Sequence, residues 1–246
     1  MPRFLMFTLA APIASFGGVA VGERRGTLER PTASALLGLL AAALGVERSD
    51  ETAHNRLAAG YQFAIRVEQP GTIFADYHTA QVPPQKKDRR FATRADELEV
   101  DDLETILSRR EYRSDVMSTV AAAAIDSAPY QLEALADALG RPTFMLYLGR
   151  KSCPLALPLA PHVVEAKDAL AAFSAHDEEE PASVRQFRAD WGYVAMPRYI
   201  ALDRGLAPPD VEAARIERRR DHPESRARRH FGLREEVIIV QSRGTS

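Results

Sequence analysis

The sequence predicts an α+β fold, because segments with the two-residue period of strands alternate with segments that have the period of helices. Up to residue 148 the predicted order is strand, helix, strand, charged segment, strand, helix, strand. The helical segments carry cap residues at their starts and glycines at their ends. The charged segment, residues 76–113, interrupts the middle of this order. The order is that of a ferredoxin-like (RRM-like) βαββαβ fold with an inserted arm.

The first strand is predicted at residues 3–10, where side chains alternate and Pro12 ends the apolar run. Arg3 followed by apolar and small residues is also typical of a secretory signal, and that alternative is less favoured. The longest later apolar run, residues 35–46, is too short to span a bilayer. We therefore expect no membrane segment.

The first helix is predicted to begin at Thr32 or Ser34 and to end at Leu44, with Gly45 just past its end. The further elements predicted up to residue 148 are a helix at 50–59, a strand at 61–69, a strand at 114–125, a helix at 127–139 with Pro129 in its first turn, and a strand at 143–148. Residues 76–113 are expected to form an extended hairpin or arm with a mobile tip, although a charged run can also be a merely solvated face.

After residue 161 the pattern predicts a short helix at 166–173, a strand near 191–202, a helix at 209–220 and a final strand at 235–241. Loops are expected at Pro208-Pro209 and at the acidic run 177–180. We expect two regions: 1–165, with the arm at about 76–113, and a smaller, divergent C-terminal region at 166–246.

Composition indicates an ordinary globular chain of 246 residues, of which 27% are charged, with a net charge of −2. Eight arginines face three acids within residues 215–234, so the charge is segregated. The single cysteine excludes an internal disulfide and a cysteine zinc cluster, and favours a reducing, cytoplasmic setting.

The motifs of several enzyme classes are absent. Gly17 and Gly22 are spaced as in a phosphate-binding loop, but Glu23 stands where that motif needs lysine. The six histidines lack the spacing of a helical metal pair. Cys153 has no histidine or acid nearby in the sequence and is predicted to be a small buried thiol. We expect no metal and no cofactor.

Two short segments suit nucleic acid. Tyr77 and His78 could perform acid–base chemistry on a ribose 2′-hydroxyl, stack on a base, or simply pack at a strand end. The run 109–113 interleaves arginines with Tyr112, so that guanidinium groups could meet phosphates while the ring meets a base. Arg24, Arg25 and Arg30 add cations from the first long loop.

Six segments, in order, carry a resemblance to a known family: ERPTASALLGLLAAALG (29–45), YQFAIRVE (61–68), DYHT (76–79), REYRSD (110–115), YLGRKSCPLALP (147–158) and RDHPESRARRHFGLREEVIIV (220–240). The chain resembles the fifth CRISPR-associated family of repeat-associated RNA-binding proteins, in the form found in type I-E CRISPR Cascade complexes. Residues 166–218 match this family poorly.

The resemblance implies a non-catalytic subunit whose palm holds the 5′ handle of the CRISPR RNA. It implies that the arm is a thumb reaching the backbone subunit CasC, that the chain touches the large subunit CasA, and that target DNA is met only through the guide. Relatives in type I-C systems cut the repeat RNA themselves, so a metal-independent endoribonuclease is the alternative.

The resemblance also implies a role for the turn at 147–158. Gly149, Arg150 and Lys151 would meet phosphates, Ser152 a ribose or base edge, and Tyr147 a base. The RNA-binding residues we predict are Arg24, Arg25, Arg30, Thr32, Tyr77, His78, Arg109, Arg110, Tyr112, Arg113, Tyr147, Gly149, Arg150, Lys151 and Ser152.

Overall fold

The computed structural model of the chain describes residues 1–18, 20, 22–84, 90–191, 199–225, 228 and 230–240. Its elements are β1 (Arg3–Ala14), β2 (Arg24–Arg25), α1 (Ala33–Leu44), α2 (Glu51–Gly60), β3 (Tyr61–Gln69), β4 (Thr72–Val82), α3 (Arg94–Leu98), β5 (Glu104–Ala124), α4 (Leu132–Gly140), β6 (His162–Glu165), α5 (Ala169–Glu178), α6 (Ala182–Asp190), β7 (Tyr199–Asp203), η1 (Arg204–Leu206), β8 (Arg215–Ser225) and β9 (His230–Ile239).

All the strands of the described residues belong to one sheet, whose main order is β6-β1-β5-β3-β7-β9-β8. Each neighbouring pair on this path is antiparallel. β4 pairs with the first part of β5, and β2 pairs with β5 in parallel. The prediction of a mixed α and β chain is confirmed, with one large antiparallel sheet as its frame.

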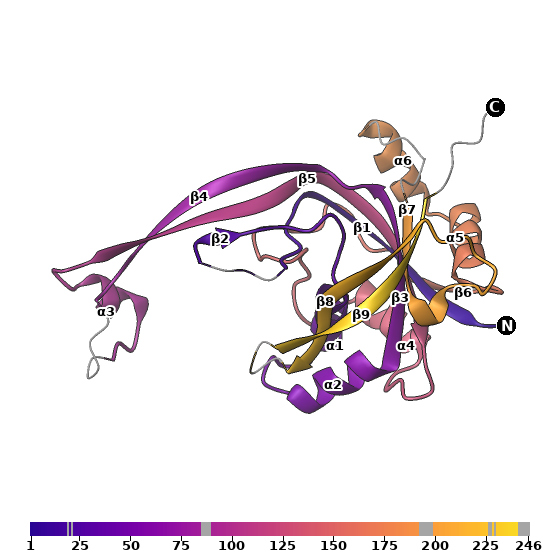
Figure 1. Cartoon of the computed structure of the whole chain (residues 1–246), viewed down its shortest axis with the longest axis horizontal. Helices are drawn as coiled ribbons and strands as arrows, with labels where there is room; N and C mark the ends of the chain where they lie inside the picture. The colour runs from indigo at the N-terminus through magenta and orange to yellow at the C-terminus, as the bar shows by residue number, and fades with distance from the viewer. Residues whose placement is uncertain are drawn as a thin grey trace.

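Both faces of the central sheet are buried, as the alternation in β1 shows. Leu5 and Phe7 point into the main core, which α1, α2 and α4 cover, whereas Phe4 and Met6 point to the opposite face, under Phe173 of α5. Figure 1 shows the two helical groups on the two sides of the sheet. Burial of β1 on both faces explains why its residues are apolar almost throughout.

The hairpin of β4 and β5 leaves this body as a long curved arm with α3 at its tip (Figure 1). Its two strands pair continuously from Thr72 opposite Ser114 to Val82 opposite Glu104. β5 is a single strand of 21 residues whose second half lies between β1 and β3. The arm is therefore the continuation of a core strand, so its direction follows from the sheet. Residues 85–89 of the predicted arm lie outside the described residues.

Local capping explains the helices that the sequence predicted correctly. Thr32 caps α1 by accepting a hydrogen bond from the amide of Ala35, and Gly45 ends the helix in the left-handed conformation at φ 76°. Asp50 caps α2 in the same way. The predictions of these two helices, of strand β3 and of a final strand are confirmed.

Other predictions were wrong. Pro12 does not end the first strand, which continues to Ala14. The helix predicted at 127–139 begins only at Leu132, so Pro129 lies outside it. Residues 143–148 form no strand, and the strand that follows α4 is β6, which pairs with β1.

The C-terminal region also departs from prediction. The helix predicted at 166–173 lies at Ala169–Glu178, so the first two residues of the acidic run, Asp177 and Glu178, end a helix instead of forming a loop. Residues 209–220 form a turn followed by strand β8, with no helix. Of the strand predicted near 191–202, residues 199–202 lie in β7, Trp191 is the C-cap of α6, and residues 192–198 lie outside the described residues. No helix in the described part of the chain combines the length and apolarity of a membrane span.

Candidate nucleic-acid interface

Three segments far apart in the sequence meet at the base of the arm. β2 lies alongside β5, with Arg24 beside Arg109 and Arg25 beside Arg110. The amide of Arg109 donates to the carbonyl of Glu23 at 3.0 Å, which fixes this pairing. The third segment is the turn from Tyr147 to Pro154, two residues that form an isolated bridge.

The turn is a closed loop locked onto the end of β1. The amide of Leu148 donates to the carbonyl of Cys153 at 2.8 Å, and the amide of Cys153 donates to the carbonyl of Arg150 at 2.9 Å. Gly149 has φ 89°, and a Cβ at this position would lie 1.8 Å from the carbonyl oxygen of Ser15. Glycine is required there because the turn packs directly on the backbone of β1. Gly149 thus has a packing role, and the implied approach of its backbone to a phosphate stays a prediction.

Arg150 joins the turn to the arm. Its guanidinium lies over the ring of Tyr112, 4.5 Å from the ring centroid. Two of its nitrogens donate to the carbonyls of Glu111, at 3.2 Å, and Arg25, at 3.3 Å. The planar guanidinium group of arginine carries five N–H donors. Arg150 can therefore make these two hydrogen bonds and still donate to another acceptor.

Glu111 is the acid at the centre of these cations. It accepts hydrogen bonds from Nε of Arg24 at 2.8 Å and from a terminal nitrogen of Arg24 at 2.5 Å. These bonds lower the pKa of the Glu111 carboxyl below its ordinary value. The carbonyl of Glu111 also accepts from the hydroxyl of Ser15 at 3.1 Å. Glu111 thus connects β2, β5, the end of β1 and, through Arg150, the turn.

Strand β2, the hairpin of β4 and β5 and the turn border an open cleft of about 420 Å³ on one face of the hairpin. Its lining residues are Arg25, Ala80, Ile106, Ser108, Arg110 and Arg150. Three guanidinium groups thus converge on a cleft with a single hydroxyl, and Nε of Arg110 donates to that hydroxyl at 3.2 Å. Such a site suits a phosphate chain, since guanidinium groups bind phosphates in bidentate fashion.

The pleat of the hairpin divides the predicted residues between its two faces. Successive side chains of a strand point to opposite faces, so Arg110 faces the cleft and Arg109 faces away. His78 lies opposite Ser108, on the cleft face, with its Nε2 2.9 Å from a carboxylate oxygen of Asp76. Tyr77 lies opposite Arg109 on the other face and is 63% exposed. The two rings therefore do not converge on one reacting atom.

Several predicted residues are structural here. Arg30 is buried and its guanidinium binds the carboxylates of Glu236 and Glu217. Thr32 is buried as the cap of α1. Arg113 donates to the carbonyls of Pro70 and Gly71, at 3.0 and 3.1 Å, where β4 begins.

Other predicted residues line or flank the turn. Tyr112 is buried and stacks on Phe74 with ring centroids 5.5 Å apart. Lys151 and Ser152 are exposed on the turn, and Tyr147 is 37% exposed. Cys153 is fully buried, and burial raises the pKa of its thiol, as expected of a packing residue.

The cleft contains residues that the sequence prediction missed. Ser108 and Ile106 come from β5 and Ala80 from β4. The spacing of Ser108, Arg110 and Tyr112 at every second residue was the signal that could have found this face, because it places these side chains on one side of a strand.

The chain is similar to known proteins over most of its length. Residues 4–236 match the family described as CRISPR-associated protein (Cas_Cas5). The chain is 34% identical over 176 residues to the CRISPR system Cascade subunit CasD of Escherichia coli (strain K12), covering 68% of this chain and 74% of the relative.

Two solved structures share the fold. A chain of a CRISPR RNA-guided surveillance complex superposes with a TM-score of 0.59 at 23% identity, covering 97% of this chain and 90% of that one. A Cas protein in a crystal structure superposes with a TM-score of 0.57 at 26% identity, covering 97% of this chain and 94% of that one.

Proposed function

Because this chain belongs to the CRISPR-associated Cas5 family, we propose that it is the guide-RNA-binding subunit of a type I-E Cascade complex and holds the 5′ handle of the CRISPR RNA. The observation that carries this proposal is the cleft at the base of the arm, where Arg25, Arg110 and Arg150 converge. A single-stranded handle of fixed sequence can splay its bases, so a short cationic cleft with adjacent polar groups can grip and read it.

We assign the parts of the fold accordingly. The strands β6-β1-β5-β3 with α1 and α4 form the ferredoxin-like palm, within residues 1–165. The hairpin of β4 and β5 is the thumb, which reaches the neighbouring backbone subunit CasC. Strands β7, β9 and β8 of the C-terminal region complete the sheet, and CasA is the further subunit that the chain touches. Target DNA is met through the guide.

The RNA track runs over the cleft face. Arg25, Arg110 and Arg150 meet phosphates there, and Lys151, Ser152 and Tyr147 extend the track along the turn. His78 contributes from β4 on the same face of the hairpin. Arg24, Arg109 and Tyr77 contact the RNA strand on the opposite face of the hairpin, where the RNA leaves the palm.

We propose further that the chain cuts no RNA. General acid and base groups must both lie within hydrogen-bond reach of the proton they transfer. Tyr77 and His78, the candidate pair, occupy opposite faces of β4.

RNA binding with and without the handle tests this function. In the assembled complex, guide RNA carrying the handle should bind about 10-fold more tightly than RNA of equal length with a scrambled handle, the effect of one or two specific contacts. The bound RNA should stay intact with and without Mg²⁺. Equal retention of both RNAs would refute handle recognition. Cleavage that His78→Ala abolishes would revive the endoribonuclease.

Replacing Glu111 by glutamine separates positioning from simple charge. Loss of a negative charge from among these arginines should by itself tighten RNA binding. We expect the opposite, about 3- to 10-fold weaker binding, because a neutral acceptor holds Arg24 and β2 less firmly than a carboxylate does. Filter binding at fixed salt measures the effect. Glu104→Gln removes the same charge from an exposed site on β5 and is the matched control; tighter binding by both variants would contradict the positioning role.

A further inference from the structure

The last two strands of the sheet present an uncovered face with mixed apolar and basic side chains. We define the outer strip as Ile216, Arg218 and Arg220 of β8 with Leu233 and Glu235 of β9. The pairing of Arg218 with Glu235 and of Arg220 with Leu233 places these side chains on one face. Ile216 is 52% exposed and Leu233 is 60% exposed. Large aliphatic groups thus lie in water at the end of a sheet whose centre is covered on both faces.

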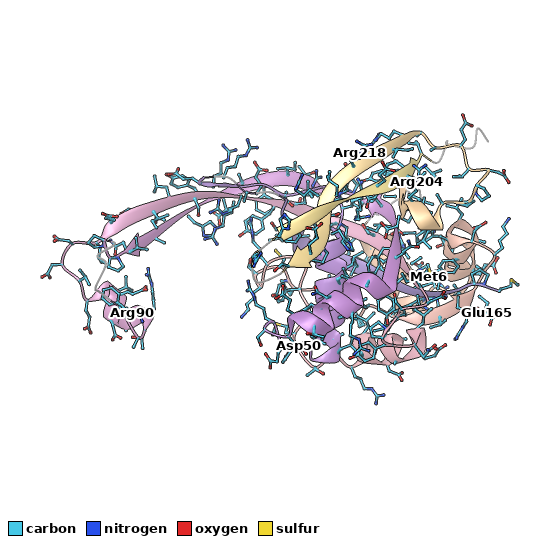
Figure 2. All side chains as sticks on the ribbon, turned by 60° about the horizontal axis from the view of Figure 1, so that its bottom comes forward. Met6, Asp50, Arg90, Glu165, Arg204 and Arg218 are labelled. Atoms are coloured by element: carbon cyan, nitrogen blue, oxygen red, sulfur yellow. The ribbon has the colours of Figure 1, made fainter. Side chains whose placement is uncertain are left out.

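The strip continues the sheet face that α5 covers elsewhere. Ile200 and Leu202 of β7 are buried on that face together with Phe173 of α5. Leu206 of η1 also packs there. Among the described residues the cover stops at this point, and β8 is the terminal strand of the sheet order. Figure 2 shows Arg204 and Arg218 at the same end of the molecule, away from Asp50 at the start of α2.

The opposite face of the same two strands is satisfied internally. Glu217 and Glu236 point inward, where both bind Arg30, and Arg234 binds Asp221 and Glu236. Stability of this region is therefore provided from the inner face. The exposed residues of the outer strip are free to serve another purpose.

The arginines of the strip, Arg218 and Arg220, and the neighbouring Arg204 of η1 are largely exposed. The side chains of Arg218 and Arg204 are 75% and 61% exposed, and both contact Glu235 at 3.2 Å. Arg220 is also exposed. One carboxylate thus stands among three guanidinium groups, and the strip carries an excess of positive charge.

These features favour a different protein as the partner, over a nucleic acid or a second copy of this chain. Arginine is enriched and lysine depleted at protein interfaces, and residues 199–240 contain no lysine. Exposed isoleucine and leucine fit an apolar protein surface, whereas they offer no ring on which a base could stack. A second copy of this chain is disfavoured, because pairing two β8 edges would place the arginines of residues 215–220 against each other.

We propose that the outer strip is a docking surface for a different protein subunit, which presents aliphatic side chains together with acidic residues. Separate aliphatic contacts would be made at Ile216 and at Leu233, and the acids would face Arg218 and Arg220. This surface lies on other strands than the cleft and does not depend on the proposed handle binding.

Charge-introducing variants test this surface in the assembled complex. Ile216→Glu and Leu233→Glu place a carboxylate at exposed positions, so the chain should fold normally. Each should weaken association with one protein subunit by about 10-fold or more, as for a central interface residue. Native mass spectrometry at increasing dilution measures this, with the guide RNA still bound. Ile125→Glu, at another apolar position that is 41% exposed, is the control and should assemble normally.

Hydrogen exchange provides the second measurement. Residues 215–220 and 231–237 should be protected in the complex relative to the free chain, and nuclease treatment that leaves the protein subunits together should not remove the protection. Unchanged assembly of both variants, or absence of protection, would overturn the proposal. Loss of guide RNA without loss of a protein subunit, or protection removed by nuclease, would show a nucleic-acid surface instead. Self-association of the free chain that both variants abolish would show a contact between copies.

Discussion

Replacing Arg150 and Lys151 together by alanine should weaken binding of handle RNA by about 10- to 100-fold. Each phosphate of a single strand that the protein no longer neutralises also reduces the counterion release that drives binding. The slope of log affinity against log salt should become shallower by about 1.4 for the two cations. Affinity of the complex for handle RNA, measured across a range of salt concentrations, provides both numbers.

The two cations contribute in different ways, so single variants are informative. Arg150 donates to the carbonyls of Glu111 and Arg25 and lies over Tyr112, whereas Lys151 is exposed on the turn. Lys151→Ala should therefore reduce the salt slope by about 0.7 without a change in thermal stability. Arg150→Lys keeps the charge but loses the planar fork, so it should keep the slope and still lower the affinity.

A matched control is Lys167→Ala, which removes an exposed cation just before α5. It should leave both the affinity and the salt slope unchanged. An unaltered slope in the Arg150 and Lys151 double variant would show that the turn does not meet phosphate. The turn would then be a purely structural support of β1.

The first half of the fold was predictable because its signals are local. Thr32 and Gly45 mark the ends of α1 through their own hydrogen bonds and backbone angle, and β3 is a run of alternating residues beside buried neighbours. The strand predicted at 143–148 was wrong for a tertiary reason. Leu146 and Leu148 fill the main core while Met145 is 79% exposed, so the residues alternate without a paired strand.

The C-terminal region was harder to predict because its inner face is charged. In β8, Glu217 and Arg219 point inward to partners on β9 and on the first loop, and Ile216 points out. Hydrophobic periodicity cannot detect an inner face whose burial is made possible by ion pairs. Arg30 was consequently predicted to contact RNA. Its partners Glu217 and Glu236 lie 187 and 206 residues away in the sequence, so no local pattern indicates that they pair with it.

Composition indicated which segments are rich in arginine but not how their side chains are arranged. Adjacent cations such as Arg109 and Arg110 look equivalent in the sequence, and only the hairpin register assigns them to opposite faces. Glu111 was overlooked because an acid among arginines is usually a solvated group. Its side-chain partner is Arg24, which the fold brings from a separate loop.

Replacing Arg234 by alanine should destabilise the chain more than any change at the cleft. Arg234 binds three carboxylates at once: Asp221 at 2.7 and 2.9 Å, Glu236 at 2.6 Å, and Asp203. The Glu236 side chain is only 1% exposed and that of Asp221 5%. Removing one partner of a buried ion pair leaves charge uncompensated and costs about 3–5 kcal/mol.

Two of these carboxylates also accept backbone hydrogen bonds. Asp221 accepts from the amide of Ala33 at the start of α1, at 3.1 Å, and Asp203 accepts from the amide of Phe63 in β3, at 2.8 Å. The substitution should therefore loosen the attachment of β8 and β9 to the palm. For a chain of this size the melting temperature should fall by about 10 °C, as thermal unfolding would show. Arg218→Ala, an exposed arginine with one carboxylate partner, should change stability by less than about 0.5 kcal/mol.

The loss of stability caused by replacing Arg234 should depend on pH through the carboxyl group of Asp221. Burial alone would raise the pKa of Asp221, but hydrogen bonds from Arg234 lower it below the ordinary value. This group therefore stabilises the native protein above the unfolded pKa of about 4, and the contribution is lost as pH falls through the lower native value. Without Arg234, burial should dominate and raise the pKa of Asp221 above the unfolded value. The deficit of the variant should then shrink on acidification from about pH 7.5 to about pH 5, because protonated carboxyls tolerate burial. A deficit that stays constant over this range would show that lost packing, and not uncompensated charge, sets the stability of this end of the sheet.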